Sequence, residues 1–367
     1  MATTKKTAPR GKAISAESLA FLKSLLDTPG PSGFESAPAK LWRKQAAKFA
    51  KVTADVHGNS MAEVNAGGSP TVMLAGHIDE IGVIITFVDD EGYGYIQPIG
   101  GWDPQVLVGQ RLRFLGRDGD VFGVIGKKPI HLIRLDEREK ATKLTEMWVD
   151  FGFQSRKEAE KFISVGDAGV IDSRTIEFPN GRLVSRSIDD RIGAYVVLEA
   201  ARRYAENPGA ARVVAVATTQ EEIAAHGGGA GVCATTIAPQ MAIVVDVTFA
   251  IDHPGLEKKE HGEAKIDGGP VLTRGSIISP VAFNLLRSTA EAHLIPFSLQ
   301  AAGRDTGTDA DAIHIAREGV PTALVSVPNR YMHSPNEMVS IEDLNRTAEL
   351  IAQTCRKVTA KTDFTAR

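Results

Sequence analysis

The sequence has few cysteines, no long apolar run and no excess of positive charge. Only two of its 367 residues are cysteine, which excludes a disulfide framework and a zinc site built from thiolates. No apolar run approaches the roughly 20 residues that a membrane helix needs. The net charge of −3 gives no basic field for nucleic acid. We therefore expect a protein of the reducing cytoplasm, with neither a membrane nor a nucleic acid as partner.

The overall composition is that of an ordinary globular protein, and the length suggests two domains or one domain with an insertion. The first 13 residues, MATTKKTAPRGKA, are basic and rich in small residues. They lack the apolar core of a secretory signal, so we expect a disordered tail.

Apolar runs and amphipathic segments alternate through most of the chain, which is typical of an α/β fold. A different pattern interrupts them at 83–180, where short β-like pieces lie between Gly and Asp turns. The sequence predicts an α/β domain of residues 14–82 and 181–367, split by a small β-barrel or sandwich. The expected helices include 14–27, one carrying Leu41, Trp42 and Phe49, 190–206, 279–293, 308–319 and 340–358.

Histidines and carboxylates gather at the ends of the expected strands. In open α/β sheets, ligands bind at the carboxyl ends of the strands, so these side chains are expected to converge. Those that follow strands are His77, Asp79, Glu80, Glu221, Glu222, Asp246 and His333, and Asp189 and Asp190 precede a helix.

Such a set, with two imidazoles and no thiolate, favours a pair of zinc, cobalt or manganese ions. In two-metal hydrolases a carboxylate often bridges the ions, roughly 3.5–4 Å apart. The adjacent pair Glu221 and Glu222 fits this chemistry. One glutamate can bind metal while the other acts as a general base, and the cations remove the repulsion between them.

Nine short motifs follow one another in order along the sequence. They are PGPSGFE (29–35), AGHIDEIG (75–82), IGGWDPQVLVGQR (99–111), GVIGKKPIHL (123–132), SIDDRIG (187–193), TTQEE (218–222), VVDVT (244–248), GTDADAIH (307–314) and NRYMHSP (329–335). In their order and spacing the sequence resembles the tetrahedral aminopeptidases, di-metal enzymes related to bacterial glutamyl aminopeptidase. The resemblance covers nearly everything after residue 14.

The resemblance implies a role for each residue of the centre. Asp189 would bridge two divalent ions, zinc or cobalt, with manganese also suitable. His77 and Asp246 would complete one metal site, and Glu222 and His333 the other. The catalytic residues would be Glu221, as general base, and Asp79, which would orient His77.

The resemblance also implies a fold and an assembly. The fold would be a zinc-peptidase-like α/β/α domain with a mixed sheet, interrupted by an inserted β-barrel that builds dimers. The dimers would assemble into a hollow tetrahedral dodecamer in the cytoplasm. The implied activity is hydrolysis of N-terminal residues from short peptides, by a water that bridges the metals and is deprotonated by Glu221.

Some residues and functions stay open at this stage. Asp309 would either contact substrate or cap a helix. Asp190 would serve backbone geometry or a hydrogen bond and not the metal, and His314 would serve packing or a cap contact. The role of His226 cannot be placed, and Ala224 stands where the family often has glycine. A metal-dependent deacylase, a glycoside hydrolase and a non-catalytic assembly protein are the alternatives. A glycoside hydrolase would leave the histidines unexplained.

Overall fold

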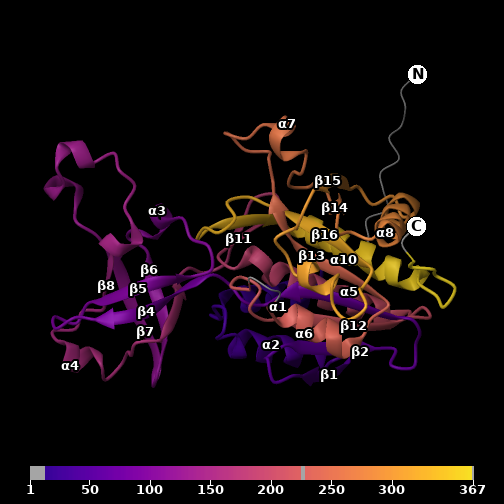
Figure 1. Cartoon of the computed structure of the whole chain (residues 1–367), viewed down its shortest axis with the longest axis horizontal. Helices are drawn as coiled ribbons and strands as arrows, with labels where there is room; N and C mark the ends of the chain where they lie inside the picture. Colours follow the sequence, from indigo (N-terminus) through magenta and orange to yellow (C-terminus); the bar gives the residue numbers. More distant parts are fainter. Residues whose placement is uncertain (1–12, 225–227, 366–367) are drawn as a thin grey trace.

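The computed structural model of the chain describes residues 13–224 and 228–365. The expected tail therefore lies outside the described residues, apart from Ala13. A large α/β part and a smaller β part lie side by side (Figure 1). None of the described helices has both the length and the apolar character needed to cross a membrane.

Within the described residues, the large part is built on one sheet of eight strands. Four neighbouring strands at its centre run parallel, and antiparallel strands lie on both sides of them, so the sheet is mixed. In spatial order the strands are β1 (Lys51–Ala54), β2 (Ser60–Val64), β12 (Arg212–Thr218), β3 (Thr71–His77), β13 (Met241–Phe249), β16 (Thr322–Asn329), β14 (Val271–Gly275) and β15 (Ser298–Ala302).

Helices cover this sheet and bury its apolar residues in one large core. The long helix α5 (Ile188–Glu206) packs on the three strands β12, β3 and β13 and is itself covered by α10 (Ile341–Lys357). The other helices of this part are α1 (Ala16–Asp27), α2 (Ser36–Ala46), α6 (Gly228–Ile237), α7 (Lys258–His261), α8 (Pro280–Ala292) and α9 (Ala310–Ile313).

The smaller part is a closed β-barrel with its own apolar core, which includes Leu112, Phe114 and Val149. Around the barrel the strands are β4 (Gly82–Val88), β5 (Gly94–Ile99), β8 (Trp148–Asp150), β7 (Gly119–Gly126), β6 (Arg111–Gly116) and β9 (Ala168–Ile171). Its short helices are α3 (Pro104–Leu107), α4 (Arg156–Ala159) and the 3-10 turns η1 (Ile130–Leu132), η2 (Leu135–Glu137) and η3 (Leu144–Glu146).

A small antiparallel sheet lies where the chain returns from the barrel. It consists of β10 (Ile176–Phe178), β11 (Arg182–Ser185) and β17 (Glu337–Ser340). The mixed sheet with its inserted barrel confirms the fold class expected from the sequence.

Two expected helices differ from those observed. α2 ends at Ala46, so Phe49 lies beyond it and packs against the core from a turn. The helix expected over 308–319 is reduced to α9, with four residues. The carboxylate of Asp311 accepts hydrogen bonds from the backbone of Thr306 and Gly307, and these bonds hold the preceding residues in a loop. At the other end, Arg317 has a positive φ of 56°, which is not helical, so the helix does not continue to residue 319.

One glycine contact brings α5 close to β3. A Cβ atom on Gly76 would lie 2.4 Å from the carbonyl carbon of Gly193, so only glycine allows this approach. The contact places the first turn of α5 beside the carboxyl end of β3. Asp189 and His77 therefore come from two elements that touch.

Candidate metal centre

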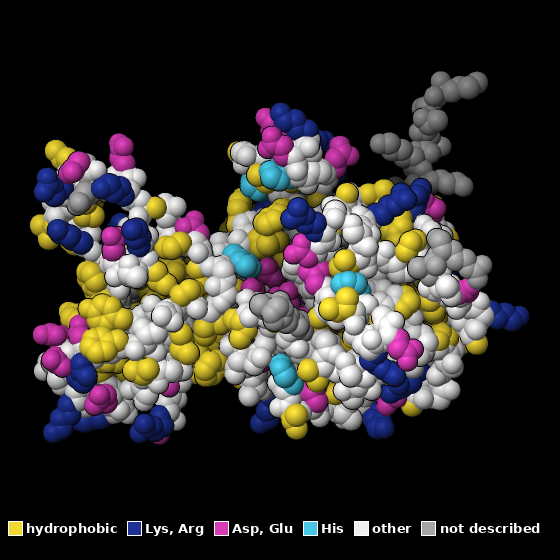
Figure 2. Space-filling model, in the orientation of Figure 1, with side chains coloured by type: hydrophobic (Ala, Val, Ile, Leu, Met, Phe, Trp, Pro, Cys, Tyr) yellow, Lys and Arg dark blue, Asp and Glu magenta, His cyan; other side chains and the backbone are white. Residues whose placement is uncertain are grey.

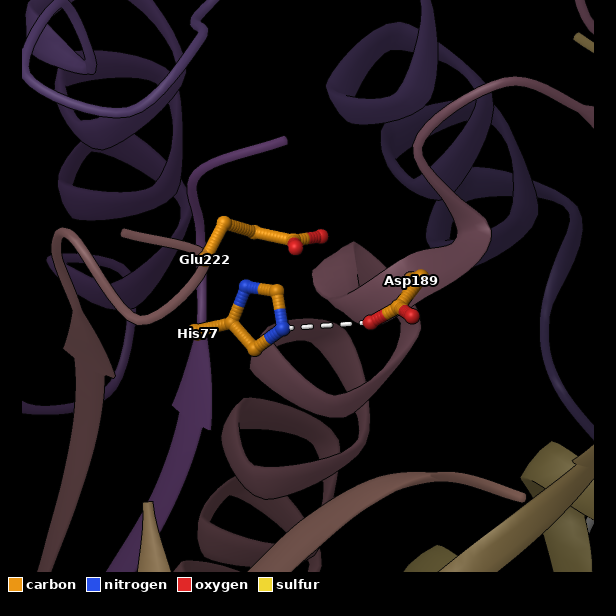
Figure 3. Close-up of side chains that lie close together, drawn as sticks. All are labelled: His77, Asp189 and Glu222. Atoms are coloured by element: carbon orange, nitrogen blue, oxygen red, sulfur yellow. Dashed lines mark hydrogen bonds and ion pairs between the residues drawn. The ribbon is translucent and has the colours of Figure 1, made fainter. Parts of the chain in front are cut away.

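His77 and Asp189 lie at the middle of the centre. The Nε2 atom of His77, the last residue of β3, is 3.1 Å from Oδ1 of Asp189 (Figure 3). Both side chains are buried. Asp189 does not have helical backbone angles, although it stands at the start of α5, and the peptide bond to Asp190 is cis.

His333 approaches Asp189 from the other side. Its Nε2 atom lies 3.3 Å from Oδ2 of Asp189 and 3.5 Å from Oε2 of Glu222. Each carboxylate oxygen of Asp189 thus faces a different imidazole. A carboxylate in this position can bridge two cations.

Two groups of side chains in the described residues have ligand atoms close enough for one cation. His77, Asp189 and Glu222 form one, with all ligand atoms within 4.8 Å of one another. His77, Asp190 and Asp246 form the other. Asp190 also accepts hydrogen bonds from the backbone N–H groups of His77 at 3.2 Å and Gly193 at 3.1 Å. Its carboxylate thus makes the kind of hydrogen bond that the sequence suggests.

The electrostatics of the centre fit divalent cations. Burial, and then the charge of Asp189, raise the pKa of Glu222 and of Asp246 well above the ordinary range. In the described part of the chain, no Lys or Arg pairs with these carboxylates. Oε1 of Glu222 is buried without a hydrogen-bond partner. Buried carboxylates and imidazoles that lack a cationic partner are suitable ligands for zinc, cobalt or manganese.

Glu221 lies beside this group. Its Oε2 atom is 3.7 Å from Nε2 of His77, and burial raises the pKa of its carboxyl group to about 8. The backbone of Gln220, which precedes it, has a positive φ of 60°. This turn directs the two adjacent glutamates to the carboxyl end of β12.

Asp79 contacts more of the centre than the sequence suggested. Its Oδ1 atom lies 3.4 Å from Nδ1 of His77, the contact expected of an orienting residue. It also accepts hydrogen bonds from the backbone N–H groups of Glu221 at 3.2 Å and Glu222 at 3.1 Å, and from the Ser32 hydroxyl. Asp79 therefore positions the glutamate pair as well as the histidine.

Comparison with known proteins identifies the family. The model of the M42 glutamyl aminopeptidase family matches residues 58–350. The chain belongs to the M42 glutamyl aminopeptidase family. It is therefore an aminopeptidase, a hydrolase of peptide bonds, as the motifs predict.

Individual M42 relatives agree over nearly the whole chain. The lysyl aminopeptidase of Pyrococcus furiosus is 34% identical over 90% of this chain and 94% of its own. A TET aminopeptidase from the marine sediment archaeon Thaumarchaeota archaeon SCGC AB-539-E09 has a TM-score of 0.90 at 32% identity, covering 94% of this chain and 98% of its own. The TET1 peptidase of Pyrococcus horikoshii, which can assemble into a tetrahedron or a large octahedral shell, has a TM-score of 0.82 at 28% identity, covering 93% and 100%.

A buried glutamate of this M42 peptidase was not expected from the sequence. Glu337, on β17, accepts hydrogen bonds from the backbone N–H groups of Asp189 at 3.0 Å and His333 at 2.9 Å. Glu35 likewise accepts a hydrogen bond from the backbone N–H of Gln220, at 3.1 Å. Glu35 stands in the motif PGPSGFE and could have been singled out there. Glu337 follows His333 by four residues without a pattern that marks it.

A cavity of about 920 Å³ opens beside the metal centre of this peptidase. Figure 2 shows acidic side chains at the bottom of a hollow in this face of the molecule. Asp309 lies in the cavity wall, where it accepts a hydrogen bond from the Thr218 hydroxyl at 2.5 Å. Asp309 stands at the N-cap of α9, and its backbone carbonyl accepts hydrogen bonds from Ala312 and Ile313, but its side chain makes no capping bond.

The other histidines play smaller parts. Nδ1 of His314 lies 3.1 Å from the carbonyl oxygen of Ala310 in its own helix, which agrees with a structural role. His226 lies outside the described residues. Ile223 and Ala224, which follow the glutamate pair, line the cavity.

Proposed function

We propose that this M42 peptidase is a two-metal aminopeptidase that removes N-terminal residues from short peptides. The observation that supports it most is the position of Asp189, whose two carboxylate oxygens face His77 and His333 separately. His77, Asp189 and Asp246 would hold one cation, and Asp189, Glu222 and His333 the other. Zinc and cobalt suit this set of nitrogen and oxygen ligands, as does manganese.

Divalent cations in such a centre lower the pKa of water and polarise a carbonyl group. The chain itself supplies the proton transfer. Glu221 takes no part in either proposed metal site, and its Oε2 atom lies 3.7 Å from Nε2 of His77. In this proposal Glu221 takes a proton from the attacking water and delivers it to the leaving amine. Asp79 keeps Glu221 in place through its backbone N–H.

The proposal extends to the domains and to the assembly. Residues 14–82 and 181–367 form the catalytic domain, and 83–180 form an inserted domain that builds dimers in the cytoplasm. Exposed apolar side chains on the barrel support this, because a lone barrel would leave them in water. They include Phe87, Tyr95, Phe122 and Val124. A TET1 relative whose structure contains a dodecamer supports an assembly of six such dimers, which light scattering of the purified protein would test.

The first experiment tests metal dependence and the need for a free amine together. The chain is stripped with a chelator, reloaded with zinc or cobalt, and given matched peptides with free or acetylated N-termini. Stepwise loss of N-terminal residues from the free peptides alone, and only with metal, is expected. Equal cleavage of acetylated peptides would instead indicate a deacylase or amidohydrolase. No cleavage after reloading would indicate a non-catalytic role for the chain.

A further inference from the structure

The cavity continues away from the metal centre along a floor of uncharged polar side chains. Asp246 and Thr248 are two positions apart on β13, so both side chains point to the same face of the sheet. Ser326 pairs with Asp246 across the neighbouring strand β16. A substrate residue held at the centre would therefore extend its side chain over this floor. The floor is made by Thr248, Thr273, Gln300 and Ser326.

The end of this floor that lies away from the metal centre is closed by a hydrogen bond between two strands of the sheet. The Thr248 hydroxyl donates a hydrogen bond to Oε1 of Gln300 at 2.8 Å. These residues lie on β13 and β15, which are separated by β16 and β14 in the sheet. The bond is possible because the edge of the sheet curls over the cavity. The floor is thus the base of a bounded pocket.

The wall above the floor carries negative charge. Asp305 and Asp309 line the cavity from the segment between β15 and α9, and Asp311 lines it from α9 itself. Asp305 is exposed, and no ion pair is found for it within the described residues. Asp311 accepts backbone N–H bonds, which hold its charge in place. Among the described lining residues there is no Lys or Arg.

Two polar groups in the pocket have no hydrogen-bond partner. The Thr273 hydroxyl is buried without a partner, as is Oδ1 of Asp309, and both residues are 2% exposed. Buried polar groups in proteins are almost always hydrogen-bonded, so these two indicate a polar ligand, and the carboxylate oxygen of Asp309 calls for a donor on that ligand. A lysine ammonium brings three donors and an arginine guanidinium five, and neither accepts.

We propose that this pocket selects peptides whose N-terminal residue is lysine or arginine. The inference rests on the proposed aminopeptidase function and names its substrate class. Two divalent cations at the centre would balance the four carboxylates of Asp189, Glu221, Glu222 and Asp246, but the charges of the 305–311 segment would remain. An acidic N-terminal residue would meet like charge from this segment, so the pocket selects against it.

The test compares the rates at which the metal-loaded enzyme releases different N-terminal residues. Lysine and norleucine p-nitroanilides differ by one ammonium group, and arginine, leucine and glutamate complete the series. We expect kcat/KM for lysine to exceed that for norleucine by about tenfold, with glutamate lowest. Free L-lysine should also inhibit more strongly than L-norleucine. Equal values for lysine and norleucine, or a preference for glutamate, would overturn the inference.

Two variants assign the selectivity to the pocket. Asp305→Lys reverses an exposed charge. It should therefore reduce the ratio of kcat/KM for lysine to kcat/KM for norleucine by about threefold to fivefold, and it should raise the rate for glutamate. Thr273→Val keeps the side-chain shape and removes the acceptor, so it should lower the rate for lysine but not for leucine. Asp118→Asn, in an exposed turn of the barrel, is the matched control and should change neither.

The outcomes separate this inference from the proposed function. If leucine or norleucine is released but neither Asp305→Lys nor Thr273→Val changes the ratio, the selectivity is wrong and the aminopeptidase stands. If no N-terminal residue is released from any substrate, the proposed function fails and the selectivity fails with it. Retained circular dichroism and elution volume show that a variant is folded.

Discussion

Glu337 accepts a hydrogen bond from the backbone N–H of Asp189 at 3.0 Å, although 148 positions separate the two residues. Its second oxygen accepts one from the N–H of His333 at 2.9 Å. One buried carboxylate thus fixes the backbone of two residues whose side chains meet at the centre. The distance between the Asp189 and His333 side chains depends on a residue that touches neither metal site.

Glu337→Gln should weaken metal binding. The amide keeps the shape but presents a donor to one of the two N–H groups, so one hydrogen bond is lost. Changes to residues that orient metal ligands typically cost 10-fold to 100-fold in affinity. Competition with a chelator, read by metal analysis, measures the effect. Glu342→Gln, at an exposed ion pair on α10, is the control, and equal metal affinity in both variants would contradict the prediction.

Glu221→Gln should abolish most activity but leave the metal content unchanged. Loss of a general base typically lowers kcat by about 10²-fold to 10⁴-fold. The matched variant is Glu222→Gln, next in the chain, which should lose metal as well as activity. Metal analysis and steady-state kinetics of the two proteins separate the roles. Loss of metal from Glu221→Gln would show that Glu221 is a ligand.

Loading of the stripped protein with zinc should release protons. Burial raises the pKa of Glu222 and Asp246 well above the ordinary range, so these carboxyl groups bind protons more tightly than ordinary carboxyl groups when no cation is present. Ligands must be ionised to bind metal, so at least about one proton should be released per chain, and fewer at higher pH. Calorimetry in buffers of different ionisation enthalpy measures this number. A value near zero at pH 6.5 would refute the protonated centre.

Asp343 should make the stability of the chain decrease as the pH rises. Burial raises the pKa of its carboxyl group to about 6, from 3.8. The folded chain therefore holds this proton more tightly than the unfolded chain does, and its stabilising effect is lost between about pH 4 and 6. Asp343→Asn cannot ionise. The free energy of unfolding of the parent, relative to this variant, should fall by about 2–3 kcal/mol over that interval.

Urea unfolding of both proteins without metal, at pH 4, 5, 6 and 7, measures this difference. The variant also loses an acceptor for the backbone N–H groups of Asp267 and Gly269, which shifts its stability by an amount independent of pH. A constant difference between the two proteins across the four pH values would therefore count against the prediction.

The sequence predicted the fold correctly in the segments that form buried strands, where the apolar residues follow a regular pattern. The runs that became β3, β12, β13 and β16 end in polar residues, and the carboxyl ends of parallel strands must lie at one edge. The convergence of His77, Glu221 and Asp246 could therefore be expected from the residues alone.

The residues that support the centre could not be predicted in this way. Glu337 acts through the backbone of residues far away in the chain, and no local spacing reveals such contacts. Ser32, which donates to Asp79, is another case. The strand 176–178 reads like the barrel strands before it but pairs with β11, because its partner is decided by tertiary structure.

The barrel leaves and re-enters the large part beside the metal centre. β4 begins at Gly82, five residues after His77, and the returning chain runs through β11 to Asp189. The two crossings are tied together by Glu80, whose buried carboxylate pairs with Arg186 and, at 2.9 Å, with Arg191. A torque applied to the barrel would thus be transmitted through two short connecting segments, and both of them end in a proposed metal ligand.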